Sequence, residues 1–301
     1  MTGIKKTEHV PVLLNEVLEN LKITKNGWYI DGTFGLGGHS REIIKKEGRV
    51  LGLDQDKETI NKGTVEYRGE IKSGALILEK ASFSTLKTVA AKHNIIPKGI
   101  LLDLGFSSWQ LDQSGRGFSF SKNEIMDMRM DPENQGVRAC DLVNGLYENE
   151  LFKLISTYGE DPLAKQIASK IVAKRKTHRI EIATELATLI EDVYKHYYHN
   201  KSLKNPATKT FQALRIVVND EINSLIQGMQ SALEVLENKG KLAIITFHGL
   251  EDRTVKKTFA AWEKYGRGNL VYKKPIYPSD EEISQNLRSH SAKLRIFNKN
   301  T

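Results

Sequence analysis

The chain has 301 residues, of which 39% are hydrophobic and 27% are charged, and its net charge is +8. This balance is typical of globular proteins and excludes the disordered and fibrous classes, and the length allows two domains. No apolar run is long enough to span a bilayer and no apolar stretch follows the first lysines, so we expect a cytoplasmic protein. The single Cys140 excludes an internal disulfide framework and a cysteine cluster for zinc, and we expect a reduced, partly buried thiol.

A glycine-rich turn between two apolar runs is the most informative segment. Residues 28–31 form a short apolar run that ends at Asp31, four glycines follow within residues 32–38, and a second apolar run ends at Asp54. Glycines let the backbone approach a ligand closely, and an acid at the end of the second strand can accept hydrogen bonds from ribose hydroxyls. The pattern predicts a βαβ unit that binds an adenosine-like cofactor.

The glycine pattern also bears on which cofactor is bound. A dinucleotide site needs Gly-x-Gly-x-x-Gly, whereas here Ser40 takes the place of the third glycine. Asp31 would repel a pyrophosphate but would suit a cationic sulfonium or ammonium group. These features favour S-adenosylmethionine over a nicotinamide cofactor. A glycine turn that only lets a helix pack on a sheet is the alternative.

The rest of the chain predicts an α/β sheet with a helical insertion. A third apolar run ends at Asp103, and in a parallel sheet this acid would converge with the two earlier ones beyond the carboxyl ends of the strands. We expect strands at residues 28–31, 50–54, 75–79, 99–104, 242–247, 270–276 and 292–298. Helical patterns occupy residues 148–157, 162–176, 182–198 and 221–236. The expected sheet domain comprises residues 1–112 and 207–301, and the insertion comprises residues 113–206.

Two segments of the insertion suggest contacts with a ligand. The helix at residues 162–176 has one apolar face and one basic face, which favours phosphate contacts, although a solvated charged face is the alternative. Residues 114–135 are rich in Gly, Ser and Asp with interleaved aromatic residues and methionines. This composition is typical of a loop that folds over a ligand, or of a hinge that packs its aromatic residues on the core.

The chain resembles the MraW family of bacterial small-subunit ribosomal RNA cytosine-N4 methyltransferases. The matching motifs lie, in family order, at residues 9–14, 31–40, 101–105, 110–112, 116–120, 126–131, 205–208, 210–216, 250–253 and 291–295. They span nearly the whole chain. Departures from the family pattern occur at Phe106, Lys209, Gly249 and residues 286–291.

The resemblance implies a class I S-adenosylmethionine-dependent methyltransferase with a Rossmann-like sheet. It implies that Gly37, Gly38 and His39 contact the methionine end of the cofactor, that Asp54 holds the ribose and that Phe83 packs on the adenine. Asp103 and Gln110 would close the site. Without the resemblance, Phe83 would be interpreted as a core residue and His39 as a helix cap.

We expect Asp103 also to orient the target amine, because it stands where amino methyltransferases carry an acceptor followed by an aromatic residue. Contacts with RNA are expected from Arg116, Lys174, Arg175, Arg215 and His248, and no metal is expected. The expected partner is small-subunit ribosomal RNA within an assembling 30S-type subunit, and a homodimer is left open. Two alternatives are a methyltransferase that acts on a different RNA and a catalytically silent RNA-binding or ribosome-assembly factor.

Overall fold

A computed structural model describes residues 11–105, 111, 114–198 and 205–300 of the chain. The chain divides into two compact units: unit 1 comprises Met1–Gly105 and Ile222–Thr301, and unit 2 comprises Phe106–Glu221. No helix within the described ranges is long and apolar enough to cross a membrane.

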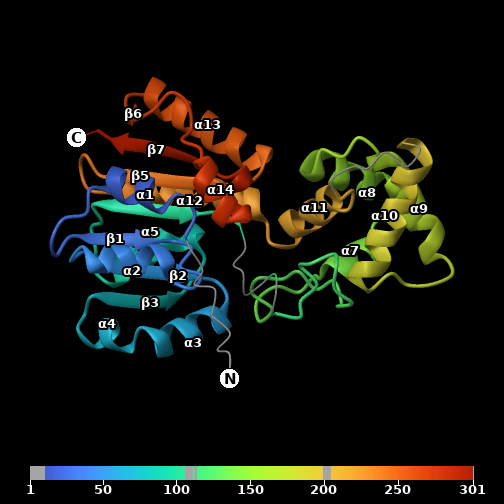
Figure 1. Cartoon of the computed structure of the whole chain (residues 1–301), viewed down its shortest axis with the longest axis horizontal. Coiled ribbons are helices and arrows are strands. Elements are labelled where there is room, and N and C mark those ends of the chain that lie inside the picture. Colours follow the sequence, from blue (N-terminus) through green and yellow to red (C-terminus); the bar gives the residue numbers. More distant parts are fainter. Residues whose placement is uncertain (1–10, 106–110, 112–113, 199–204, 301) are drawn as a thin grey trace. The chain divides into compact units, whose positions relative to one another are not determined.

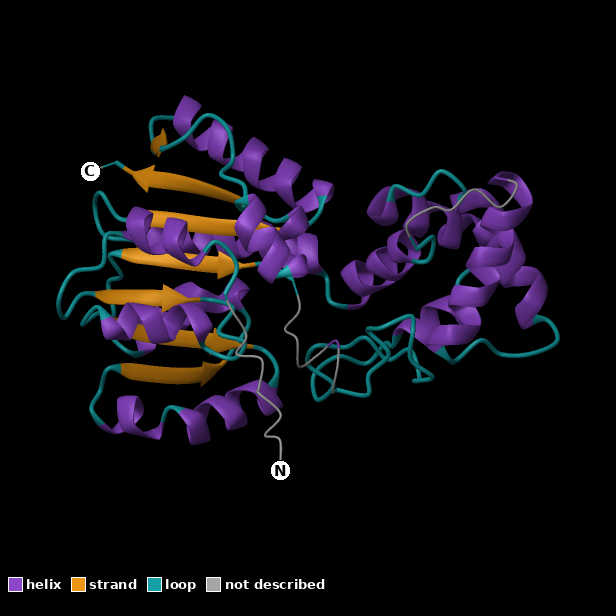
Figure 2. Cartoon of the chain, in the orientation of Figure 1, coloured by secondary structure: helices purple, strands orange, loops and turns teal. Residues whose placement is uncertain are grey.

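Unit 1 contains a sheet in which seven strands are described, in the order β3-β2-β1-β4-β5-β7-β6 (Figure 1, Figure 2). Strands β1 to β5 are parallel, and β7 is antiparallel to both β5 and β6. Their bounds are β1 (Trp28–Asp31), β2 (Arg49–Asp54), β3 (Leu76–Lys80), β4 (Gly99–Asp103), β5 (Lys241–Thr246), β6 (Gly268–Leu270) and β7 (Lys293–Lys299). The acids Asp31, Asp54 and Asp103 are the last residues of three neighbouring parallel strands, so they lie at the same edge of the sheet.

Helices cover both faces of this sheet. Successive strand residues point to opposite faces, so Ile100 and Leu102 belong to one hydrophobic cluster and Leu101 to another. The first cluster includes residues of α5 (Leu86–Lys92), α12 (Glu221–Val235) and α13 (Gly249–Lys264), and the second includes residues of α1 (Leu14–Leu21) and α2 (Gly38–Lys45). Unit 1 also contains α3 (Lys57–Glu66), α4 (Arg68–Lys72), η1 (Phe83–Thr85), α14 (Asp280–Gln285) and η3 (Leu287–Ser291). Unit 1 is therefore a three-layer α/β/α structure, as expected.

Unit 2 is helical. Its elements are α7 (Ala139–Gly145), α8 (Glu148–Leu154), the π-helix η2 (Ile155–Gly159), α9 (Ala164–Arg175), α10 (Ala183–Tyr198) and α11 (Thr208–Val218). These helices share one hydrophobic core. Residues 114–138 contain no long element, but Met126, Met128 and Met130 are buried in this core. The backbone of Met126 forms hydrogen bonds with the backbones of Glu181 and Cys140, so this part of the loop expected to fold over a ligand is anchored within unit 2.

Most expected strands match within one residue, and the exceptions have identifiable causes. The strand expected at 270–276 is observed at Gly268–Leu270, and among the later residues only Ile276 forms a further isolated bridge, to Leu294; Pro275, directly before it, has no N–H to donate to the ladder. Helix α8 ends at Leu154 and continues as the π-helix, rather than as the single helix expected at 148–157.

Two expectations about unit 2 also differ from the structure. The insertion expected at 113–206 falls within the larger unit Phe106–Glu221, which includes α11. The sequence pattern places α11 in the sheet domain, but this helix packs on α7, α8 and η2. Cys140 is fully buried rather than partly buried, and burial raises the pKa of its thiol.

Candidate functional site

The glycine loop after β1 has a conformation that requires glycine. Gly37 has a φ of 72° and precedes α2, and a Cβ at this position would lie 2.6 Å from the hydroxyl oxygen of Tyr67 and 2.7 Å from the ring of Phe34. The Tyr67 hydroxyl lies 2.9 Å from the carbonyl oxygen of Leu36 and 3.0 Å from that of Gly37, and it donates to these oxygens. A Cβ at Gly38 would lie 2.5 Å from Pro11. The loop backbone is thus held in one tight conformation at the carboxyl edge of the sheet.

Asp31 is buried directly below this loop. Its Oδ2 accepts a hydrogen bond from the Ser40 hydroxyl (2.7 Å) and its Oδ1 accepts one from the Thr33 N–H (3.3 Å). Burial raises the pKa of Asp31 to about 6, although both hydrogen bonds act in the opposite direction. Ser40, which breaks the dinucleotide pattern, therefore orients the strand-end acid.

Asp54 joins the glycine loop to the start of α3. Its Oδ2 accepts from the Gly35 N–H (3.0 Å) and its Oδ1 accepts from the Asp56 N–H (2.9 Å). Each oxygen keeps a second lone pair, so the carboxylate can still accept bonds from two ribose hydroxyls. Burial raises the pKa of Asp54 to about 7, and the charges of Asp56 and Asp31 act in the same direction.

Asp103 faces His39 across the site. The Nε2 of His39 donates to the carbonyl oxygen of Val12 (3.0 Å), and its Nδ1 lies 3.8 Å from Oδ2 of Asp103. The Oδ1 of Asp103 is buried and has no hydrogen-bond partner among the described residues. Burial raises the pKa of Asp103 well above its ordinary value, and the charges of Asp31 and Glu251 add to this effect. The imidazole therefore lies within ion-pair distance of the carboxyl group.

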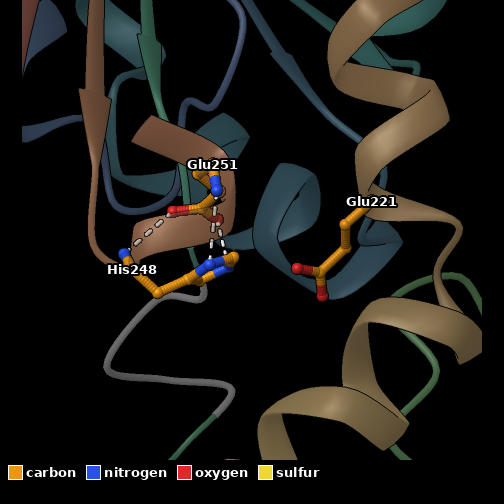
Figure 3. A group of neighbouring side chains, drawn as sticks. All are labelled: Glu221, His248 and Glu251. Atoms are coloured by element: carbon orange, nitrogen blue, oxygen red, sulfur yellow. Dashed lines mark hydrogen bonds and ion pairs between the residues drawn. The ribbon is translucent and has the colours of Figure 1, made fainter. Parts of the chain in front are cut away.

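Glu251 and His248 form the cap of α13, next to the end of β5. The carboxylate of Glu251 accepts from the backbone N–H groups of Phe247 (2.8 Å) and His248 (3.3 Å), and His248 Nε2 lies 3.0 Å from Oε1 of Glu251 (Figure 3). The Nδ1 of His248 accepts from the Glu251 N–H (3.4 Å). Sequence reasoning missed Glu251, although an acid three residues after a capping residue is a recognisable helix-start pattern. His248 is engaged in this capping box.

Phe83 lies at the start of η1, beside the glycine loop. A Cβ at Gly228 of α12 would lie 2.4 Å from the Phe83 ring, and a Cβ at Gly32 would lie 3.1 Å from Phe83 Cβ. The side chain is partly buried and packs against one of the sheet's hydrophobic clusters. Its contacts within the chain are thus those of a core residue, and its role toward adenine stays a prediction.

One expected site residue, Gln110, lies outside the described residues. The residues Phe106, Ser107 and Ser108 that follow β4 in the sequence also fall outside the described ranges.

The arginines of unit 2 that were expected to contact RNA are engaged in the fold. Arg116 donates to the carbonyl oxygens of Arg129 (2.9 Å) and Met130 (3.2 Å). Arg175 donates to the last carbonyls of α7, at Val143 (2.7 Å) and Leu146 (2.6 Å). Arg215 is buried and forms a two-point ion pair with Glu221 (2.8 and 2.9 Å). These contacts stabilise unit 2, and they occupy guanidinium N–H groups that RNA phosphates would otherwise bind.

The lysines of α9, in contrast, point to solvent. The apolar face of the helix, with Ala164, Ile167, Ala168 and Ile171, is buried as expected. Lys165, Lys170, Lys174 and Lys176 are exposed, and none of them forms an ion pair with the residues that the structure describes. This lysine face remains available to an anionic partner.

Comparison with known proteins decides the family. The sequence pattern of the MraW methylase family matches residues 6–300. The chain is 41% identical over 312 residues to ribosomal RNA small subunit methyltransferase H of Carboxydothermus hydrogenoformans, with 97% of each protein covered. It is 40% identical over 309 residues to the protein of the same name from Lawsonia intracellularis, with 97% of this chain and 99% of the relative covered. The chain belongs to the MraW methylase family.

Membership in the MraW methylase family confirms several expectations drawn from the sequence. The chain is a methyltransferase, its methyl donor is S-adenosylmethionine, and its sheet order is that of the class I fold. The geometry fits this cofactor, because a tight glycine backbone and the carboxyls of Asp31, Asp54, Asp103 and Glu251 meet at one edge of the sheet. Four acids in one place create a negative potential that favours a cationic sulfonium and an ammonium group.

Two motifs of the MraW methylase family that carried the resemblance meet in an ion pair. Asp252 of α13 accepts from Arg295 Nε (2.6 Å) and Lys293 Nζ (3.3 Å) of β7. The two cations hold the pKa of Asp252 below its ordinary value, although burial acts in the opposite direction. The motifs at 250–253 and 291–295 thus hold α13, the helix that carries Glu251, against the antiparallel strand β7.

Proposed function

We propose that this protein transfers a methyl group from S-adenosylmethionine to the N4 amino group of a cytidine in small-subunit ribosomal RNA. The names of its relatives support the class of substrate. The main structural support for this chemistry is the environment of Asp103. Its carboxyl group lies at the end of a strand and has a raised pKa, and one of its oxygens is buried with no hydrogen-bond partner among the described residues.

The exocyclic amine of cytosine is a poor nucleophile, because its lone pair is delocalised into the ring. A carboxylate that accepts a hydrogen bond from the amine localises that lone pair and orients it toward the methyl carbon. When bound, S-adenosylmethionine supplies a methyl group that its sulfonium already activates. The N4–C bond forms as the S–C bond breaks, and the amine proton then leaves to the Asp103 carboxylate or through it to water.

The raised pKa of Asp103 suits this role. Burial and the charges of Asp31 and Glu251 make the carboxylate a stronger base than an ordinary aspartate. His39 can balance its charge, because the bond from Nε2 to Val12 fixes one proton on the ring and leaves Nδ1 facing Asp103. We assign Asp103 as the catalytic residue and His39 as a positioning residue that also lines the cofactor site.

The remaining roles follow from position. Gly37 and Gly38 hold the backbone close to the methionine end of the cofactor, and Asp54 accepts the ribose hydroxyls with its free lone pairs. The exposed lysines of α9 contact RNA phosphates, with Lys174 among them.

Methylation of small-subunit ribosomal RNA tests the proposal. The purified protein and S-adenosylmethionine are incubated with unmodified RNA, offered both free of protein and within isolated small subunits, and the RNA is digested to nucleosides for mass spectrometry. We expect N4-methylcytidine, and the better of the two substrates identifies the assembly state that the protein acts on. Methylation of a different base or a different RNA, or intact cofactor binding with no methylation, would contradict the proposal and favour one of the two alternative functions.

A further inference from the structure

The segment after β6 loops out from the edge of the sheet in unit 1. The Val271 N–H donates to the Ile296 carbonyl (3.0 Å), and Ile276 exchanges two backbone hydrogen bonds with Leu294 (2.9 Å each). These anchors are two residues apart on β7 but five residues apart on the segment. Residues 272–275 therefore project from the edge strand. We name residues 272–277 the edge loop.

The edge loop carries two adjacent lysines between two tyrosines. Tyr272 is 46% exposed and Tyr277 is 59% exposed, and Lys273 and Lys274 are also exposed. In the part of the chain that the structure describes, neither lysine forms an ion pair and neither ring packs on another aromatic ring. Exposed rings beside unpaired cations are typical of surfaces that bind single-stranded nucleic acid, where bases stack on the rings and phosphates contact the cations.

The charge of the surrounding segment points to the same partner. Residues 253–277 contain seven basic residues and one acid, and all seven basic residues are exposed. This net charge of +6 in 25 residues accounts for most of the chain's net charge of +8. A polyanion is the partner that such a surface attracts.

The register of the sheet places the edge loop level with Asp103. Ile276 pairs with Leu294, Leu294 pairs with Ile245, and Ile245 pairs with Asp103. Neighbouring strands lie about 4.8 Å apart, so three steps across the sheet cover about 14 Å. At about 3.4 Å per stacked base, this distance corresponds to roughly four nucleotides.

We propose that the edge loop binds the single-stranded RNA that flanks the target cytidine, with Lys273 and Lys274 at phosphates and Tyr272 and Tyr277 stacked on bases. The inference rests on the proposed function, and it adds a second RNA-binding surface that belongs to the catalytic unit itself. RNA held here would position the target base at the carboxyl edge of the sheet.

The test is binding of a fluorescein-labelled single-stranded 12-mer of cytidylate to the full chain, measured by anisotropy at several salt concentrations. K273A/K274A should raise Kd about five- to tenfold and lower the slope of log Kd against log salt by about 1.4, because two phosphate contacts are lost. Y272A/Y277A should raise Kd at least about tenfold with little change in this slope, because stacking depends weakly on salt.

The matched control is K45A/K46A, which removes two adjacent exposed lysines at the end of α2, at the amino end of β2 and so away from the carboxyl ends of the parallel strands. This control should bind like the wild type. If K273A/K274A matches K45A/K46A in both Kd and slope, the inference is wrong. Ultraviolet crosslinking of the wild-type protein to the same RNA provides a second readout, and adducts absent from Tyr272 and Tyr277 would also count against it.

Failure of the proposed function is separable from failure of this inference. If the wild type does not methylate ribosomal RNA but its binding of the 12-mer depends on the edge loop, only the proposed function fails. If the wild type methylates ribosomal RNA and the edge-loop variants bind like it, only the edge loop is excluded.

Discussion

Substitution of Asp103 is the most direct test of the proposed chemistry. Asp103→Asn keeps an acceptor oxygen but removes the charge, so single-turnover methylation at saturating S-adenosylmethionine should fall by about 10²- to 10⁴-fold, with a smaller effect on RNA affinity. Asp103→Ala should be slower still, because the acceptor is lost. A near-wild-type rate for Asp103→Ala would remove Asp103 from the chemistry and direct attention to Ser107, Ser108 and His248.

The same substitution should stabilise the cofactor-free protein. The folded-state pKa of Asp103 is raised above its unfolded value, so its contribution to stability is present at low pH and is lost as pH rises through the folded pKa. Above that pH the ionised carboxylate destabilises the fold, and Asp103→Asn removes this destabilisation. Its amide can donate toward Nδ1 of His39, and it no longer repels Asp31 and Glu251.

We therefore expect a higher Tm for cofactor-free Asp103→Asn than for the wild type at pH 8, with the difference shrinking toward pH 5. Each kcal/mol corresponds to roughly 2–4 °C for a domain of this size, so scanning calorimetry can resolve the effect. A Tm at pH 8 equal to or below that of the wild type would show that the ionised carboxylate of Asp103 does not destabilise the fold.

At the scale of single elements, neighbouring residues of α9 have opposite roles. Lys174 is exposed, whereas Arg175 binds the last carbonyls of α7. Reversal of both charges together would therefore confuse RNA binding with the stability of unit 2. Separate substitutions distinguish the two roles.

We expect K170A/K174A to raise the Kd for RNA and to lower the salt slope by about 1.4, with unchanged Tm and unchanged cofactor binding. Arg175→Ala should instead destabilise unit 2 by about 1.5–3 kcal/mol through the loss of charge-assisted hydrogen bonds. Thermal unfolding and salt titrations of the two variants measure these effects. An unaltered salt slope in K170A/K174A would mean that the lysine face of α9 is only solvated.

At the scale of the whole molecule, the sheet is largely predictable because each strand combines an apolar run with a polar end. The acids Asp31, Asp54 and Asp103 mark the ends of three strands in the sequence itself, and the closely spaced glycines indicate the position of the loop that follows β1. The edge strand is less predictable. The strand expected at 270–276 contains four apolar or aromatic residues besides Lys273, Lys274 and Pro275, but the observed strand ends at Leu270.

The roles of individual cations are not predictable from local pattern. Arg175 and Arg215 lie in basic segments that resemble phosphate-binding surfaces, yet their partners are backbone carbonyls of α7 and the carboxylate of Glu221. Such partners lie up to 32 residues away in sequence, so only the tertiary fold reveals them. The contribution of Glu251 to the site also depends on the fold, because α13 brings its charge close enough to raise the pKa of Asp103.

The convergence of acids from distant segments predicts that cofactor binding is coupled to proton release. In the cofactor-free protein, burial raises the pKa of Asp31 to about 6 and that of Asp54 to about 7, and Asp103 also titrates well above its ordinary range. A cationic ligand favours the ionised carboxylates, so binding must expel protons that these groups hold near neutral pH. Affinity for S-adenosylmethionine should therefore fall as pH decreases below about 7, by up to tenfold per pH unit for each proton released.

Calorimetry at pH 6.5 in buffers with different ionisation enthalpies counts the released protons, and we expect about one from Asp31 and Asp54 together and a further contribution from Asp103. S-adenosylhomocysteine is a matched control, because it lacks the sulfonium charge and should release fewer protons. Asp54→Ala should weaken binding by about 1.5–3 kcal/mol and reduce the proton count, since it removes both the ribose acceptor and one titrating group. Affinity that is independent of pH between 5.5 and 8, with no buffer dependence of the enthalpy, would mean that the acids at the carboxyl edge of the sheet are already ionised in the free protein.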